Sequence, residues 1–211
     1  MSRVAPPPAL HIVTDDQVLS RPDFLGIATE LLVVLQWKLA LHIRGKATPT
    51  VVLFNIANAL AAKAEFVGTH LIINDRADIA LAFDRVGVHV GARSLPVERV
   101  RELLPRPRRI GYSAHSATEA ARAERAGADF ILAGSIYKTP SHPDVLPGGI
   151  GLLSEVVDTC SAPVIAIGGI GTGQVGEVLS TGAYGVAVIR AVWDAPDPVQ
   201  AAEELVKLLE S

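Results

Sequence analysis

Two positively charged side chains follow an aliphatic segment of the chain, and their types suit an anionic ligand. Arg44 and Lys46 stand two residues apart at the end of the segment KLALHI. An Arg side chain binds an anion through a bidentate fork, whereas Lys binds as a point charge. Two solvated charges on a loop would give the same pattern. The pair alone therefore fits either an anion-binding site or a solvated loop.

Paired glycines mark a second place of this kind. The aliphatic segment 163–167 ends in Gly168 and Gly169, and a second aliphatic segment, 185–189, ends at Arg190. Glycines let backbone N–H groups approach a ligand closely, because no Cβ intervenes. A helix that begins after such a loop directs its positive end to the same place. Together these features favour a phosphate site over a simple turn.

Three of the six histidines are expected near these anion-binding residues, namely His42, His115 and His142. A general acid or base at neutral pH would most economically be one of them, although each is also a common structural hydrogen-bonding residue. His11 and His89 lie inside predicted strands, so we expect them in the core. The sequence contains neither a histidine pair with metal-ligand spacing on a helix nor a paired-cysteine zinc motif.

The dipeptide Asn74-Asp75 follows the apolar residues LII. Its side chains could hold a metal ion or a polar ring, but the same dipeptide is common in turns. The dipeptide alone does not distinguish a binding site from a turn.

The composition argues against several classes of function. The net charge is -3 and aromatic residues make up 5% of the 211 residues, which argues against nucleic-acid and membrane-surface binding. No window of about 18 uncharged apolar residues is present, and the N-terminal segment lacks the apolar core of a signal peptide. The single cysteine excludes an intrachain disulfide. We expect a cytoplasmic protein with no nucleic-acid partner and no membrane segment.

Short aliphatic segments alternate with segments of helical periodicity along the chain. This alternation predicts a parallel sheet, and eight such units in 211 residues predict a closed (β/α)8 TIM barrel in one domain, residues 1–211. The polar residues after the strands would then share the rim where sites on this fold lie. The predicted strands are 9–13, 38–43, 70–73, 86–90, 109–112, 129–133, 163–167 and 185–189. The helices with predicted bounds are 23–36, 49–64 (capped by Thr48), 77–83, 96–104, 117–126, 151–159 and 199–209.

Several segments together resemble the thiamine phosphate synthase/TenI family. They are HIVTDD, HIRGK, LIINDRADIAL, GVHVG, GYSAHSATEAARAERAGADFILAG, PVIAIGGI and GAYGVAVIRAV, and they cover nearly the whole chain in the family's order. The resemblance implies a TIM barrel with one of two activities. Thiamine phosphate synthase joins a hydroxymethylpyrimidine diphosphate to a thiazole phosphate, using Mg²⁺ and releasing pyrophosphate. TenI proteins instead tautomerise a thiazole carboxylate phosphate without a metal.

The resemblance also implies roles for individual residues. Arg44 and Lys46 match two cations of the synthase that hold the pyrimidine diphosphate, whereas His42 replaces a Gln, as in TenI-like sequences. Asp75 matches a magnesium ligand. The other positions implied to bind substrate or phosphate are Asn74, Ser113, Lys138, Gly168, Gly169 and Arg190.

Departures from the synthase pattern concern the diphosphate and its metal. Ser94 stands where the synthase has its second metal-binding Asp. His142 stands at the position of a diphosphate-contacting Lys, although Lys138 is close, and Arg190 replaces a small Ser. Losing that carboxylate and that Lys removes stabilisation of the leaving group. We therefore expect a TenI-like thiazole tautomerase that needs no cofactor.

The catalytic base of such a tautomerase is not at its usual place. Ser135 stands where TenI-like tautomerases are expected to have a catalytic His, so His42 or His142 would have to move the proton. Ser135 is kept as the third candidate catalytic residue.

Two alternatives stay open. A divergent thiamine phosphate synthase would use Asp75 and Mg²⁺, because Mg²⁺ can bind through one carboxylate together with phosphates and waters. A non-catalytic regulator would bind a thiazole phosphate or thiamine phosphate in an inherited pocket. In every case the partner is a small phosphorylated thiazole or thiamine phosphate, and the resemblance suggests a homodimer.

Overall fold

Eight parallel strands close into a barrel in the computed structural model, which describes residues 6–140 and 146–211. Each strand pairs with the next along the chain, and the last pairs with the first. The expected TIM barrel is therefore confirmed. The strands are β1 (Leu10–Val13), β2 (Leu39–Ile43), β3 (His70–Asn74), β4 (Gly87–Val90), β5 (Ile110–Ala114), β6 (Phe130–Gly134), β7 (Val164–Ile167) and β8 (Gly185–Val188).

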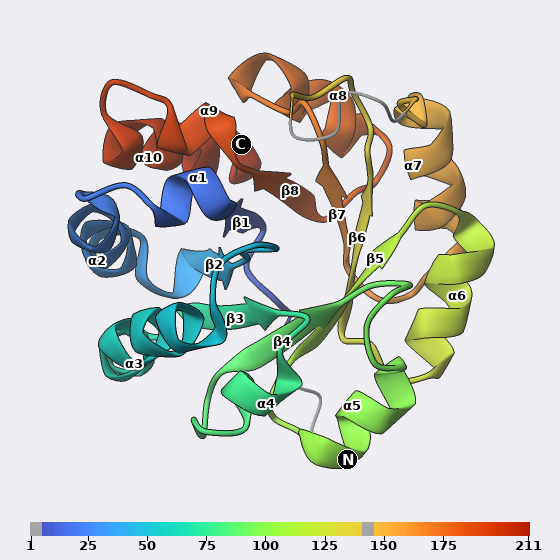
Figure 1. Cartoon of the computed structure of the whole chain (residues 1–211). Coiled ribbons are helices and arrows are strands. Elements are labelled where there is room, and N and C mark those ends of the chain that lie inside the picture. Colours follow the sequence, from blue (N-terminus) through green and yellow to red (C-terminus); the bar gives the residue numbers. More distant parts are fainter. Residues whose placement is uncertain (1–5, 141–145) are drawn as a thin grey trace.

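Helices alternate with the strands and surround the barrel (Figure 1). The last helix packs against α2, which closes the ring of helices. The helices are α1 (Asp16–Leu19), α2 (Phe24–Leu35), η1 (Gln36–Lys38), α3 (Thr50–Val67), α4 (Ala77–Ala80), α5 (Val97–Leu103), α6 (Ala117–Arg125), α7 (Gly149–Thr159), η2 (Thr172–Gln174), α8 (Val175–Ser180), α9 (Arg190–Trp193) and α10 (Pro198–Leu209).

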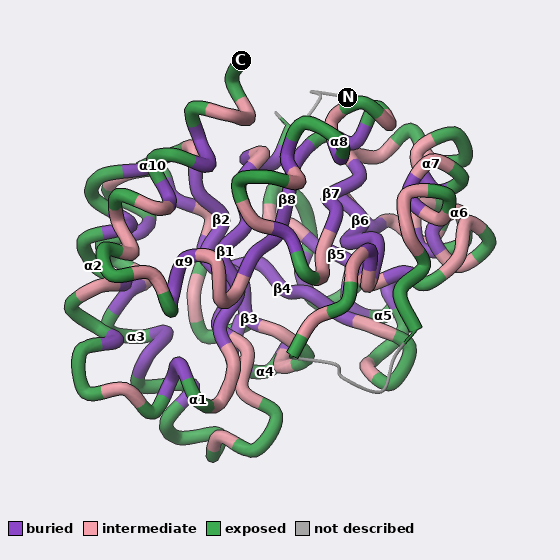
Figure 2. The backbone as a smooth tube through the Cα atoms, turned by 90° about the horizontal axis from the view of Figure 1, so that it is seen from above, coloured by how far each residue is buried: buried purple, intermediate pink, exposed green. Residues whose placement is uncertain are grey.

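The strand side chains form two separate cores, because successive residues of a strand point to opposite faces. One set packs beneath the helices, and the other fills the barrel around Ile72 and Phe130. Three buried histidines, His11, His42 and His89, share the interior with Phe130. Figure 2 shows the buried strands at the centre and exposed outer faces on the helices. The expectation that His11 and His89 lie in the core is confirmed.

Two four-residue helices lie outside the predicted pattern. α1 follows β1 and α9 follows β8, and four residues are too few to show helical periodicity. The cap expected for α3 also differs. The Thr48 hydroxyl donates to Asp16 Oδ1 at 2.6 Å, and Pro49 takes the cap position. These differences concern the rim, where local contacts rather than periodicity shape the backbone.

Among the described residues, α3 is the one helix that is long and apolar enough to cross a membrane by length and composition alone. In the barrel it packs against β2 and β3. Leu53, Ile56 and Leu60 form its buried stripe. α3 is thus placed as one of the ring of barrel helices.

Candidate active site

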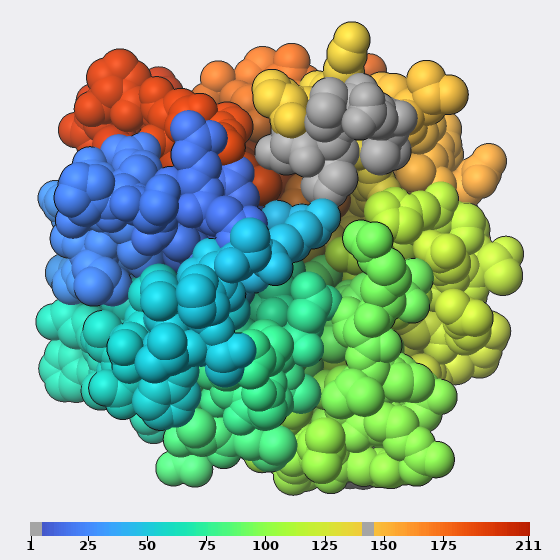
Figure 3. Space-filling model, viewed as in Figure 1, coloured from blue at the N-terminus to red at the C-terminus, as the bar shows by residue number. Residues whose placement is uncertain are grey.

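A cavity of about 980 Å³ opens at the C-terminal ends of the strands. The loop after β2 projects across this face of the molecule (Figure 3). Sites on TIM barrels lie at this end, because the βα loops converge there. The predicted site residues that line the cavity are Arg44, Lys46, Asn74, Asp75, Ser113, Ser135, Gly168, Gly169 and Arg190.

Three cations gather on one side of the cavity, namely Arg44, Lys46 and Arg93. The charge of Arg44 is the largest influence that lowers the pKa of Lys46, followed by burial and by the charge of Arg93. Asp75 offsets this in part. Like charges held together in this way favour the arrival of an anion. The cluster suits a ligand with several negative charges, such as a diphosphate.

Asp16 holds the loop that carries Lys46. Its carboxylate accepts backbone hydrogen bonds from Lys46 at 3.1 Å, Ala47 at 2.9 Å and Thr48 at 2.8 Å. Burial alone would raise the pKa of Asp16, but these bonds and the Thr48 hydroxyl outweigh burial and lower it. Gly45 permits the turn, because a Cβ there would lie 2.3 Å from Thr48 Oγ1. The basic loop is thus built around the half-buried carboxylate of Asp16.

Asp75 is the acidic side chain among the described residues that line the cavity. It accepts a hydrogen bond from Ser94 Oγ, which itself accepts from the backbone N–H of Gly91 at 2.9 Å. Within 6–140 and 146–211, no group of three His, Cys, Asp or Glu residues could hold a metal. A single carboxylate fits Mg²⁺ that arrives with phosphate oxygens and water, because Mg²⁺ keeps several waters and seldom binds in an all-protein cage.

Gly168 and Gly169 have φ values of +106° and +66°, a region that favours glycine. They also let two loops pack closely. A Cβ on Gly168 would lie 2.1 Å from Ser135 Oγ, and one on Gly169 would lie 2.5 Å from the carbonyl oxygen of Lys138. The Ser135 hydroxyl donates to the Tyr137 carbonyl at 3.0 Å. The two glycines therefore shape the joined loops after β6 and β7, beside the cavity.

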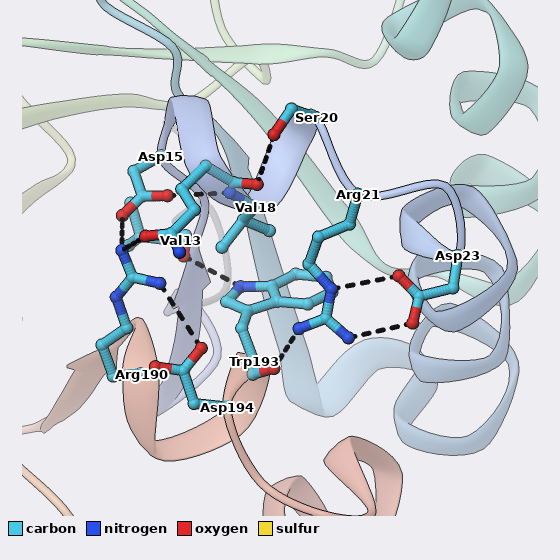
Figure 4. Close-up of polar contacts among 10 residues, drawn as sticks. Val13, Asp15, Val18, Ser20, Arg21, Asp23, Arg190, Trp193 and Asp194 are labelled. Carbon is cyan, nitrogen blue, oxygen red and sulfur yellow. Dashed lines mark hydrogen bonds and ion pairs between the residues drawn. The ribbon is translucent and has the colours of Figure 1, made fainter.

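Arg190 lines the cavity, but its guanidinium already has protein partners (Figure 4). Nη2 lies 2.6 Å from Asp15 Oδ2 and 2.9 Å from Gln17 Oε1. Nη1 lies 3.4 Å from Asp194 Oδ1. A bound anion at this place would compete with the carboxylate of Asp15. Contact between Arg190 and phosphate stays a prediction.

His42 lies in a different environment from the one expected. Its ring is 0% exposed and does not line the cavity. Burial lowers the pKa of His42 to about 4, and the contact with Asn74 opposes this only in part. His42 thus contacts the cavity-lining residue Asn74 without lining the cavity itself, and its role in moving a proton on the substrate stays a prediction.

His89 and His115 are the histidines that line the cavity among the described residues. His89, assigned by sequence only to the core, places Nε2 2.7 Å from Ser113 Oγ. His115 is exposed, and its backbone N–H donates to Glu119 at 2.8 Å. Both residues therefore line the cavity, whereas His42 does not.

Two further predicted site residues, Lys138 and His142, have different outcomes. Lys138 is exposed and does not line it. His142 lies outside the described residues, so its catalytic role stays a prediction. Asp15 and Asp16 follow the first predicted strand, and the sequence pattern indicates no specific role for either. The signal that could have found them is the acidic pair directly after the first strand, at the same rim as Arg190 and Lys46.

Comparisons with known proteins agree with this geometry. The sequence profile described as thiamine monophosphate synthase matches residues 10–192. A thiamine-phosphate synthase of Desulfitobacterium hafniense (strain DSM 10664 / DCB-2) is 39% identical over 204 residues, covering 95% of this chain and 96% of that protein. One of Methanoregula boonei is 44% identical over 167 residues, covering 79% and 77%.

Two solved structures are also similar to this chain. A thiamine phosphate pyrophosphorylase from Pyrococcus furiosus has a TM-score of 0.82 and 34% identity, and the match covers 96% of each chain. A 3-hexulose-6-phosphate synthase from Salmonella typhimurium has a TM-score of 0.68 at 16% identity, covering 96% of this chain and 98% of that one. The second likeness concerns the fold alone.

Proposed function

Because this chain belongs to the thiamine monophosphate synthase/TenI family, we propose that it is a thiamine-phosphate synthase. The reaction joins the methylene carbon of a hydroxymethylpyrimidine diphosphate to the ring nitrogen of a thiazole phosphate. The carbon–oxygen bond to the diphosphate breaks, and pyrophosphate leaves with the electron pair. The sequence alone ranked this activity second, behind a thiazole tautomerase, and the names of the similar proteins support it over the first.

The observation that carries the proposal is that one cavity has two different regions suited to anions. Arg44, Lys46 and Arg93 form a cationic side, and the glycine loop after β7 forms another part of the lining. Two phosphorylated substrates need two such regions. Apolar residues, among them Ile167 and Ala187, also line the cavity and suit aromatic rings.

Each region has a task in this reaction. Arg44 and Lys46 would bind the diphosphate and stabilise the charge that develops as it leaves, an effect typically larger than other single contributions to catalysis. Gly168 and Gly169 would hold the phosphate of the thiazole. These contacts would bring the ring nitrogen and the methylene carbon together, which converts an encounter of two molecules into a reaction within one complex.

Asp75 is the residue that would hold Mg²⁺, together with phosphate oxygens and water. When bound, the metal would help to neutralise the leaving diphosphate. Since Ser94 supplies no second carboxylate, we propose that the ion enters with the diphosphate and binds the free protein weakly.

The proposal is tested by measuring pyrophosphate release. Release should require both substrates and Mg²⁺, and it should stop when either substrate is omitted. Equal release without the thiazole phosphate would indicate simple hydrolysis and would contradict the proposal.

A thiazole tautomerase is the second candidate, favoured by the single carboxylate at the cavity. It would use the same glycine loop, with Arg44 and Lys46 orienting the substrate carboxylate. Accelerated interconversion of the thiazole carboxylate phosphate isomers, followed by NMR without Mg²⁺, would support it. Tight binding of a thiazole phosphate with neither activity would instead indicate a regulator.

A further inference from the structure

A chain of hydrogen bonds crosses the barrel interior and ends at the cavity. His11 Nε2 lies 3.1 Å from the carbonyl oxygen of Pro8, and His11 Nδ1 lies 2.8 Å from His42 Nε2. His42 Nδ1 lies 3.3 Å from the atom assigned as Asn74 Oδ1. Both rings are fully buried, whereas Asn74 lines the cavity. This series of hydrogen bonds therefore links the buried backbone at Pro8 to Asn74, a residue of the candidate site.

The Pro8 carbonyl determines where the ring hydrogens lie. A carbonyl only accepts, so His11 Nε2 carries a hydrogen. No carboxylate takes part in the chain. Burial is the largest influence that lowers the pKa of His11, followed by the nearby His42 and His89, and burial also lowers the pKa of His42. Both rings are thus neutral at pH 7, with one hydrogen each.

One hydrogen per ring leaves a single arrangement along the chain. His11 has its hydrogen on Nε2, so its Nδ1 is bare and accepts from His42 Nε2–H. His42 in turn presents a bare Nδ1 to Asn74. That nitrogen can only accept, so the Asn74 amide must meet it with its NH2 group.

The direction of the Asn74 amide follows from this arrangement. The contact is assigned to Asn74 Oδ1, but the oxygen and nitrogen of an amide have the same shape, so the hydrogen-bond network decides which atom faces His42. We propose that His11 is a positioning residue that acts through His42 and turns the NH2 group of Asn74 inward, so that the carbonyl oxygen of Asn74 serves the cavity.

This arrangement sets the chemistry of the ligand group that Asn74 meets. A carbonyl oxygen accepts a hydrogen bond from an N–H or O–H group and repels a phosphate oxygen. Resting on the proposed function, Asn74 would contact a hydrogen-bond donor on a substrate ring rather than the diphosphate. The ring hydrogens themselves do not depend on which reaction the protein catalyses.

Long-range ¹H–¹⁵N NMR of the ligand-free full chain at neutral pH shows which ring nitrogens carry hydrogen. We expect Nε2–H and a bare Nδ1 on both His11 and His42. In His11→Phe, His42 Nε2 loses its acceptor, so we expect His42 to switch to Nδ1–H and to donate to the Asn74 oxygen. His70→Phe, at the opposite end of the barrel, is the matched control and should leave the His42 signals unchanged.

A hydrogen on Nδ1 of either ring in the unsubstituted protein would overturn the proposal. So would a folded His11→Phe variant in which His42 keeps Nε2–H. If that variant does not fold, the unsubstituted protein still decides, because its spectrum alone separates the two arrangements. Absence of synthase activity with both expected tautomers present would overturn the proposed function and leave the positioning role standing.

Discussion

The guanidinium of Arg190 and the carboxylate of Asp15 lie 2.6 Å apart, although 175 positions separate them in the chain. The contact joins the end of β1 to the first residue of α9, where β8 closes the barrel against β1 (Figure 4). Nearby, the indole N–H of Trp193 donates to the Val13 carbonyl at 3.0 Å. This ion pair therefore links the segments after β1 and β8, where the barrel closes, and it also neutralises a cation that lines the cavity.

Asp15→Asn separates these two effects. Asn caps a helix as well as Asp does, so the bond from Val18 N–H to residue 15, 2.9 Å in the native chain, should survive. Losing the negative charge leaves Arg190 free to attract anions, and we expect pyrophosphate to bind about threefold to tenfold more tightly by calorimetry. The free energy of unfolding should fall by about 1 kcal/mol.

Asp194→Asn is the matched control for this variant. Its carboxylate is more exposed and lies 3.4 Å from Arg190, so both effects should be smaller. If Asp15→Asn binds pyrophosphate no more tightly than the native chain, Arg190 does not contribute to anion binding.

Ser94→Asp should restore a second carboxylate beside Asp75, because the Ser94 hydroxyl already contacts the Asp75 side chain. Affinity for a hard cation rises with the number of charged oxygen ligands. We expect the Mg²⁺ concentration for half-maximal pyrophosphate release to fall by at least about tenfold. Ser94→Ala, which removes the hydroxyl without adding charge, should not lower it. An unchanged Mg²⁺ dependence in Ser94→Asp would show that the metal does not bind at Asp75.

Gly169→Ala should damage the loop after β7. The position has φ +66°, which costs a residue with a Cβ about 1–2 kcal/mol, and the new Cβ would lie 2.5 Å from the Lys138 carbonyl oxygen. We expect a loss of roughly 2 kcal/mol in urea unfolding together with weaker binding of thiazole phosphate. Gly171→Ala is the control, since φ is -130° and the nearest atom to its Cβ is 3.5 Å away. Equal stability of the two variants would contradict this account of the loop.

Three buried histidines and the half-buried His70 should make the fold sensitive to acid. Burial is the largest cause that lowers the pKa values of four histidines, in the cases of His42 and His70 to about 4. The unfolded chain therefore binds more protons than the folded one between about pH 4 and pH 6.5. Stability should rise with pH through this window, by up to about 1.4 kcal/mol per pH unit for each histidine. The four are His11, His42, His70 and His89.

His70→Gln tests this pH dependence away from the cavity. Gln keeps an acceptor for Arg109 Nε, which donates to His70 Nδ1 at 2.9 Å in the native chain. Removing one titrating ring should reduce the slope of unfolding free energy between pH 4 and 6.5 by up to about 1.4 kcal/mol per pH unit. An unchanged slope would mean that His70 charges equally in the folded and unfolded states.

The regular part of the fold follows from local sequence patterns, whereas the rim does not. Alternating aliphatic and helical segments predict the barrel, and the order of the strands places Arg44, Lys46 and Gly168 at one end. The pairing of Asp15 with Arg190 depends on closure of the barrel between the two ends of the chain. No local pattern encodes a contact of that kind.

His42 shows a second reason why sequence predicts the site only in part. It precedes Arg44 by two residues, so its place beside a basic pair suggested a site residue. In the barrel it lies on the inward face of β2, where it contacts His11 and His89. Only the three-dimensional arrangement shows that His42 contacts Asn74 and does not itself line the cavity.

The central claim is tested most directly by ³¹P NMR of one reaction that contains the protein, hydroxymethylpyrimidine diphosphate, thiazole phosphate and Mg²⁺. We expect pyrophosphate and thiamine phosphate to appear in equal amounts, and Asp75→Asn to slow both by about a hundredfold. Unchanged substrate signals, together with rapid isomerisation of the thiazole carboxylate phosphate in a parallel sample without Mg²⁺, would contradict the synthase assignment.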